Sequence, residues 1–340
     1  MTPSLLWIPP DDLRYAHGVS LVRAMEWTLL SRKTLDAMAR ADDAAEALEE
    51  LSETHYASFM TPGQHVADFE LILSRALESA YLLFRRLVLD PDLEQGALRL
   101  HDFHNLKAML KANLEGSEPV GIVPFGLVDA RCIRDAVEGR DYQGLPLDLA
   151  AVARQALGSY QISRDPRLLE VIIDTAAVAA RVSSFAGLNT QVLPDYAVLL
   201  ADTTNIRTVV RMGRSNQDPS LFDLACIPGG SLPVDSLRLS LGKRATLGEV
   251  YSMTPYAKAV REGLAYLQEK NSYAVLDREL ENLLIGTLRE TRFVFFSPAP
   301  IVAFLLAREH EVRMIRLVMV AKINRIPAEL IAARLPMLYA

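Results

Sequence analysis

Apolar residues recur along most of the chain at the spacing of an α-helix. Between residues 69 and 88, apolar positions follow the i, i+3, i+4, i+7 rule that gives a helix one buried face. Residues 106–114 and 315–323 carry the same period, whereas alternation over five or more residues is hard to find. The pattern predicts an all-α protein.

Pairs of a capping residue and a proline mark where helices begin. Ser, Thr and Asp accept a free amide at a helix N-terminus, and proline at the first helical position loses no hydrogen bond. Such pairs predict helix starts at Thr61-Pro62, Asp90-Pro91, Asp165-Pro166, Asp218-Pro219, Thr254-Pro255 and Ser297-Pro298. Two stretches rich in turn residues, 116–126 and 215–233, predict longer loops that divide the chain into thirds.

The thirds carry one repeated motif. Its copies read Asp102-Phe-His-Asn105-Leu-Lys107, Asp202-Thr-Thr-Asn205-Ile-Arg207 and Glu311-Val-Arg-Met314-Ile-Arg316. The same offsets of 100 and 209 residues relate Glu70, Glu170 and Glu279. In addition, Leu51-Ser-Glu-Thr54-His-Tyr56 resembles Val250-Tyr-Ser-Met-Thr254-Pro-Tyr256. Repeats of this length indicate a triplicated domain rather than a solenoid, whose periods are about 20–50 residues.

The triplication predicts three similar helical bundles around an approximate threefold axis. Their predicted bounds are residues 1–118, 119–220 and 221–340. Such bundles would leave a central concave surface, which suits gripping a shaft better than holding a small molecule.

The repeated motif allows two interpretations. Asp102 and Asn105 lie one helical turn apart and can meet, as can Asp202 and Asn205, so they could form buried polar pairs that set the helix register. Alternatively, the motif presents its Asn and cationic positions to a partner. The candidate residues under either interpretation are Asp102, Asn105, Lys107, Asp202, Asn205, Arg207, Glu311 and Arg316.

Composition narrows the function classes. Half of the 340 residues are apolar and 23% are charged, which excludes a disordered or fibrous chain. The formal charge of −6 means that the chain as a whole has no positive field that would attract nucleic acid. Cys132 and Cys226 lie too far apart for a zinc ribbon and are expected to be buried. The longest uncharged stretch, 293–307, contains two prolines and is shorter than the ~20 residues of a membrane span.

Motifs of catalysis are missing from the sequence. It lacks the glycine patterns of phosphate and dinucleotide loops, the G-x-S-x-G elbow and the H-E-x-x-H zinc motif. His101 and His104 fall short of the three or four ligands of a zinc site. The segment 36–53 has seven acids and one base, which is typical of a solvated helix face. We therefore expect no catalytic residue, metal or cofactor.

Several separated segments, taken in order, resemble one known family. They are Tyr15-Ala16-His-Gly18-Val19, Thr54-His55-Tyr56, the two Asp–Asn motif copies, Pro228-Gly229-Gly230 and residues 315–326. Over about residues 15–335 the sequence resembles the C subunit of bacterial and archaeal V/A-type rotary ATPases, the counterpart of the d subunit of V-ATPases. The third copy departs from the pattern because Met314 stands at the Asn position.

The resemblance implies a funnel-shaped, all-helical adaptor without catalytic activity. It would sit on the cytoplasmic face of the membrane rotor ring, receive the central-stalk subunits D and F, and pass torque between the ATPase head and the ion-translocating ring. It would be present in one copy, monomeric by itself, without nucleic acid, cofactor or inserted lipid anchor. The alternatives are a helical scaffold unrelated to rotary motors and a helical enzyme with an unrecognised acidic site.

Overall fold

The chain folds into helices that divide between two compact units. The computed structural model describes residues 12–61, 65–190, 192–215, 220–241 and 244–340. No strand occurs in these residues, so the all-α prediction is confirmed. The terminal unit holds the described parts of residues 1–89, 189–196 and 251–340, and the central unit those of 90–188 and 197–250. The three-domain, threefold arrangement stays a prediction.

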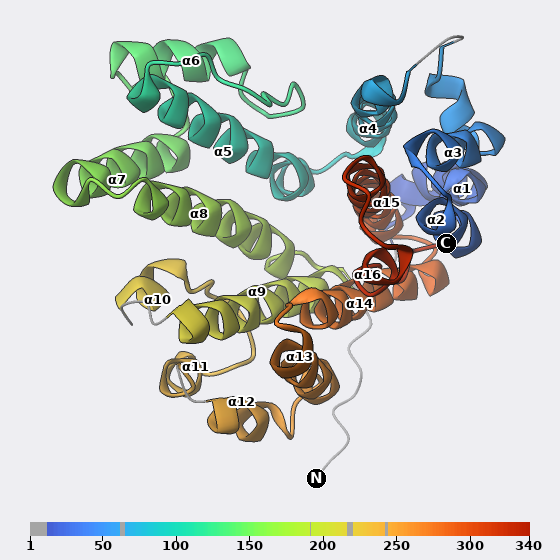
Figure 1. Cartoon of the computed structure of the whole chain (residues 1–340). Helices are drawn as coiled ribbons and strands as arrows, with labels where there is room; N and C mark the ends of the chain where they lie inside the picture. The colour runs from blue at the N-terminus through green and yellow to red at the C-terminus, as the bar shows by residue number, and fades with distance from the viewer. Residues whose placement is uncertain (1–11, 62–64, 191, 216–219, 242–243) are drawn as a thin grey trace. The chain divides into compact units, whose positions relative to one another are not determined.

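The terminal unit joins helices from both ends of the sequence. Its helices are α1 (Ala16–Met25), α2 (Arg32–Arg40), α3 (Ala44–Glu49), α4 (Phe69–Leu87), α13 (Ala257–Lys270), α14 (Ala274–Glu290), α15 (Ala299–Ile323) and α16 (Ala328–Ala332). Short 3-10 turns lie at Leu13–Tyr15, Glu26–Thr28, Glu50–Glu53, His55–Phe59, Val66–Asp68 and Thr291–Phe293. Figure 1 shows α15, in red, beside α4 and the blue helices α1–α3, with which it makes contact.

Helix α15 forms the centre of the terminal unit. All its residues from 299 to 308 are buried, and a helix that is apolar all round belongs inside a protein. Ile315 and Val318 of α15 share one core cluster with Leu35 of α2 and Ile72 of α4. Burial of apolar surface, which contributes about 25 cal/mol per Å², therefore holds α15 against the N-terminal helices α2 and α4.

The central unit is built around α5. Its helices are α5 (Pro91–Glu115), α6 (Ala130–Gly139), α7 (Leu147–Ser163), α8 (Pro166–Ala186), most of α9 (Leu193–Ser215), α10 (Ser220–Ala225), α11 (Val234–Leu239) and most of α12 (Arg244–Tyr251). Helix α5 packs along α8 and against α6, and α7 packs on α8 (Figure 1). Phe103, Leu106, Ile133 and Leu149 lie in the core that α5–α8 share.

Capping residues begin helices where the sequence predicts them. Helix α5 starts directly after Asp90, with proline in its first turn. Helix α8 starts after Asp165, whose carboxylate accepts the amide of Arg167 at 2.9 Å. Ser297 accepts the amide of Ala299, the first residue of α15, at 3.2 Å. The side chains of Asp165 and Ser297 satisfy amides that have no partner within the helix, whereas Asp90 makes no such bond.

Other predicted boundaries differ or fall outside the described part. Pro62, Asp218 and Pro219 lie outside the described residues, so the predictions that involve them are not tested. The loop at 116–126 is confirmed. The predicted loop at 215–233 instead contains α10, which packs against α8 and whose Phe222 is fully buried. A single buried aromatic side chain stabilises a short helix that the surrounding turn residues do not predict.

No helix in the described ranges is long and apolar enough to cross a membrane.

The contact between α13 and α14 generates a stability prediction. A Cβ at Gly263 of α13 would lie 2.6 Å from the Cβ and 2.8 Å from the Cα of Leu276 in α14. Because backbone cannot move aside, Gly263→Ala should lower the free energy of unfolding by about 1–3 kcal/mol in urea titrations followed by circular dichroism.

Gly286 provides the matched control, because nothing lies within 4 Å of a Cβ built there on α14. Gly286→Ala should stabilise the protein by about 0.5–1 kcal/mol, since alanine loses less backbone entropy in a helix. Equal effects of the two substitutions would contradict the close approach at Gly263.

Candidate functional site

The repeated motif places its polar side chains inside the protein. Its copies lie on α5, α9 and α15, here called the motif helices. Asp102, Asn105, Asp202, Asn205 and Glu311 are all buried, with no more than 3% of each residue exposed. Buried polar groups need hydrogen-bond partners, and in each copy the partners include backbone groups of a loop or turn. We call each arrangement a clamp.

The first clamp fixes the loop after α5. The Asn105 side chain donates to the carbonyl of Val123 at 2.8 Å and accepts its amide at 2.8 Å. Asp102 accepts the amide of Val128 at 3.0 Å and the guanidinium of Arg99 at 3.0 Å. A Cβ at Gly126 would lie 2.1 Å from Asp102 Oδ1, so the loop approaches the helix closely only with glycine there.

The second clamp repeats this chemistry on α9. Asn205 donates to the carbonyl of Ile227 at 2.9 Å and accepts its amide at 2.7 Å. Asp202 accepts the amides of Ser231 and Leu232 at 3.0 and 3.1 Å, and the Ser231 hydroxyl at 2.6 Å. Gly230 stands where Gly126 stands in the first clamp, with a Cβ position 2.1 Å from Asp202 Oδ1.

Asp102 and Asn105 do not pair with each other as the spacing suggests. Both point from one face of α5 toward the returning loop, and each binds a different part of it. The reason is geometric, because a backbone amide and carbonyl satisfy the Asn carboxamide better than one carboxylate does.

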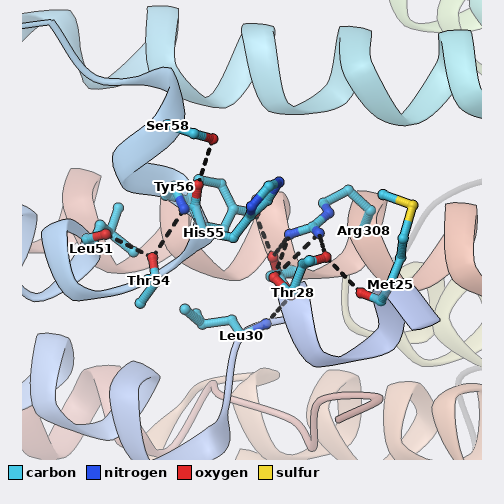
Figure 2. A network of polar contacts seen from close by, with 10 residues as sticks. Met25, Thr28, Leu30, Leu51, Thr54, His55, Tyr56, Ser58 and Arg308 are labelled. Atoms are coloured by element: carbon cyan, nitrogen blue, oxygen red, sulfur yellow. Dashed lines mark hydrogen bonds and ion pairs between the residues drawn. The ribbon is translucent and has the colours of Figure 1, made fainter. Parts of the chain in front are cut away.

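The third clamp connects α15 to the N-terminal part of the terminal unit. Glu311 accepts the amide of Leu30 at 2.5 Å and the hydroxyl of Tyr56 at 2.6 Å. Arg308 pairs with the Glu311 carboxylate at 2.5 Å and donates to the Thr28 hydroxyl at 2.8 Å. Figure 2 shows Arg308 between Thr28 and the Tyr56 turn. This clamp is an ion pair between side chains that are both almost fully buried.

An arginine three residues before the acid recurs in two clamps. Arg99 pairs with Asp102, and Arg308 pairs with Glu311. The two arginines are 209 residues apart, the same offset that relates the first and third copies of the motif. Neither arginine was among the candidates from the sequence, although this offset could have found them. Met314 takes the Asn position in the third clamp and joins the apolar core instead.

Burial dominates the electrostatics of the clamps. It raises the pKa of Tyr56, and the neighbouring Glu311 carboxylate raises that pKa further, so the phenol remains a hydrogen-bond donor. Burial also raises the pKa of Asp102, against the opposing effects of the Val128 amide and Arg99. The pKa of His55 is lowered by burial and by the positive charge of Arg308.

The cationic motif residues lie on the surface of the motif helices or near it. Lys107 Nζ lies 2.7 Å from Asp174 of α8, and Arg316 lies 2.8 Å from Glu70 of α4. Arg207 is half-buried on α9. Exposed pairs of this kind contribute about 0–1 kcal/mol each. The partner-facing role of these cations stays a prediction.

The two similar segments that contain Thr54-x-Tyr56 and Thr254-x-Tyr256 fold into the same turn. The hydroxyl of Thr54 donates to the Leu51 carbonyl at 2.7 Å and accepts the amide of Tyr56 at 3.2 Å. Thr254 makes the same two bonds, at 2.7 and 3.3 Å, 200 residues later. The repeat therefore extends from side-chain identity to local geometry.

The remaining candidates have structural contacts or lie on the surface. His104 bonds the carbonyl of Gly121 at 2.9 Å, and the ring of His101 packs edge-on against Phe125. In the described part of the chain, no group of three His, Cys, Asp or Glu residues could hold a metal ion. Cys132 is exposed, so the expectation that it is buried is wrong. Its position on an outer face of the short helix α6 explains the exposure.

The first two clamps generate a prediction about stability. Asn105→Ala and Asn205→Ala each leave a loop amide and carbonyl without their partner, so each should cost about 1–3 kcal/mol in unfolding free energy. Gln155→Ala, at an exposed position of α7, serves as the control and should change it by less than about 0.5 kcal/mol. Asn variants that melt like the wild type would show that the clamps do not stabilise the fold.

The third clamp generates a second prediction. Glu311→Gln leaves the Arg308 guanidinium buried without its counter-charge, which should cost about 3–5 kcal/mol in urea unfolding. Arg316→Gln removes only an exposed pair with Glu70 and should cost no more than about 1 kcal/mol. A Glu311 effect as small as the Arg316 effect would rule out a buried, coupled pair.

Comparison with known proteins identifies the family of the chain. The model of the ATP synthase (C/AC39) subunit family matches residues 19–334. The C subunit of the V-type sodium ATPase of Enterococcus hirae is 23% identical, over 96% of this chain and 99% of its own length. The C subunit of a V-type ATP synthase of Thermus thermophilus is 29% identical, over 75% of this chain and 81% of its own length. The C subunit of the A-type ATP synthase of Pyrococcus furiosus is 21% identical, over 96% of this chain and 91% of its own length. The chain belongs to the ATP synthase (C/AC39) subunit family, as its sequence motifs suggest.

Proposed function

We propose that the chain is the non-catalytic adaptor of a V/A-type rotary ATPase, and that it couples the central-stalk subunits D and F to the membrane rotor ring. The observation that carries the proposal is the family match over residues 19–334. Relatives aligned over most of this chain are named as the C subunit of a V-type sodium ATPase and of A-type and V-type ATP synthases. The chain would act on the cytoplasmic side, held at the membrane by the ring.

The clamps support a role in transmitting force. A part that carries torque must resist deformation, and each clamp fixes a loop to a motif helix through buried hydrogen bonds. In the terminal unit, Glu311 ties the C-terminal helix to Leu30 and Tyr56. Force on either segment would therefore pass into one shared core.

Exposed aromatic side chains support a role within a larger complex. Trp27, Phe293 and Phe295 of the terminal unit are 79%, 81% and 65% exposed. Arg23 holds their two segments together, because it pairs with Glu26 and donates to the carbonyl of Val294 at 3.2 Å. Aromatic residues are enriched at protein interfaces, so a neighbouring protein of the complex would cover this surface.

The test is capture of the tagged chain with purified D–F pair and with solubilised membranes. The chain should bind the D–F pair and membranes that contain the rotor ring, and it should bind neither ring-free membranes nor pure lipid vesicles. By itself it should hydrolyse no ATP. Failure to bind both D–F and the ring would favour an unrelated scaffold, and hydrolysis abolished by a point mutation in this chain would favour an enzyme.

A paired substitution tests whether the aromatic surface takes part. Trp27→Ser with Phe293→Ser should leave the melting temperature unchanged and weaken capture of at least one partner by about tenfold or more, the effect of losing interface hot spots. Leu147→Ser with Ile162→Ser is the control, because both side chains are 89% exposed on α7 of the other unit. Equal capture by both double variants would remove this surface from the proposal.

A further inference from the structure

A basic cavity lies in the central unit, where α5, α6 and α7 end. Its volume is about 660 Å³, within the range of small-molecule sites. Three arginines line it, namely Arg140, Arg154 and Arg164, together with the amide side chains of Asn113 and Gln161. None of the described lining residues is acidic. The local positive charge contrasts with the formal charge of −6 of the chain.

A tyrosine with a buried hydroxyl is among the residues that line the same cavity. Tyr142 lines the cavity and is 6% exposed. Among the described residues its hydroxyl has no hydrogen-bond partner. Burial raises the pKa of Tyr142, although Arg140 and Arg154 act against this shift, so the group remains an O–H donor. A buried donor without an acceptor is costly, and a bound acceptor would remove that cost.

Only two of the three arginines lie at the C-terminus of a helix, where a positive charge is favourable. Arg140 and Arg164 follow α6 and α7 with left-handed backbone, φ 53° and 58°, where a cation interacts favourably with the helix C-terminus. Arg154 lies inside α7, where the helix dipole gives no reason for a charge. All three side chains are exposed, and in the described structure none of them pairs with a carboxylate, so their donors are available to a ligand.

We propose that this cavity binds a small phosphate-bearing molecule. Guanidinium groups bind phosphate oxygens through paired, charge-assisted hydrogen bonds. Leu110, Val137 and Leu157 form an apolar wall against which the body of the ligand can pack. The site is separate from the clamps and does not depend on the proposed adaptor role.

Calorimetry with ADP, adenosine and pyrophosphate tests the proposal on the full chain. ADP should bind, adenosine should bind at least about tenfold more weakly, and ADP affinity should fall with added salt. Arg154→Gln and Arg164→Gln should each weaken ADP binding at least about tenfold. Arg131→Gln is the control, because Arg131 is exposed on α6 and does not line the cavity.

Three results would overturn the proposal. The first is absence of binding by both ADP and pyrophosphate, and the second is equal binding of ADP and adenosine. The third is unchanged ADP affinity in the cavity variants with a lowered melting temperature, which would mean that the arginines only stabilise helix ends. Arg154→Gln is decisive if the Arg164 variant does not fold, because Arg154 does not end a helix.

Discussion

The terminal unit depends on one buried carboxylate. Glu311 on α15 binds the amide of Leu30, 281 residues earlier in the sequence, and the hydroxyl of Tyr56. Taking this carboxylate and Arg308 out of water costs several kcal/mol per ion, and only the complete set of partners offsets that cost. Neither end of the unit can therefore detach without leaving charge buried and unpaired, which makes the fold of the two ends cooperative.

The central unit fixes its loops with Asn carboxamides and Asp carboxylates, and in the first clamp Arg99 pairs with Asp102. Its loops follow their motif helices directly in sequence, so closing them requires less ordering than joining the two ends of the chain. Each loop is held by one Asn and one Asp. The carboxamide of Asn105 or Asn205 binds one amide and one carbonyl of the loop, as a second backbone segment would. Gly126 and Gly230 allow the backbone to come close to that Asp. The third copy replaces Asn by Met314, keeps an arginine–acid pair like that of the first copy, and binds partners that are remote in sequence.

The sequence was sufficient to predict the all-α class and several helices, but not the partners of the repeated side chains. Apolar period and capping prolines act within a few residues, so α4, α5 and α8 follow from them. The spacing of Asp102 and Asn105 shows that they share a helix face, whereas the loop that returns to this face is decided by packing. For the same reason α10 was missed, since Phe222 stabilises it only through contacts with distant residues.

The clamps also decide where recognition can occur in this family member. Their polar atoms are already satisfied by backbone and by neighbouring side chains, so they cannot bind a partner without unfolding a loop. In the proposed adaptor role, partners must instead bind surface features such as Trp27 and Phe293. The buried acid and Asn positions of the repeated motif thus fix loops and turns to the motif helices.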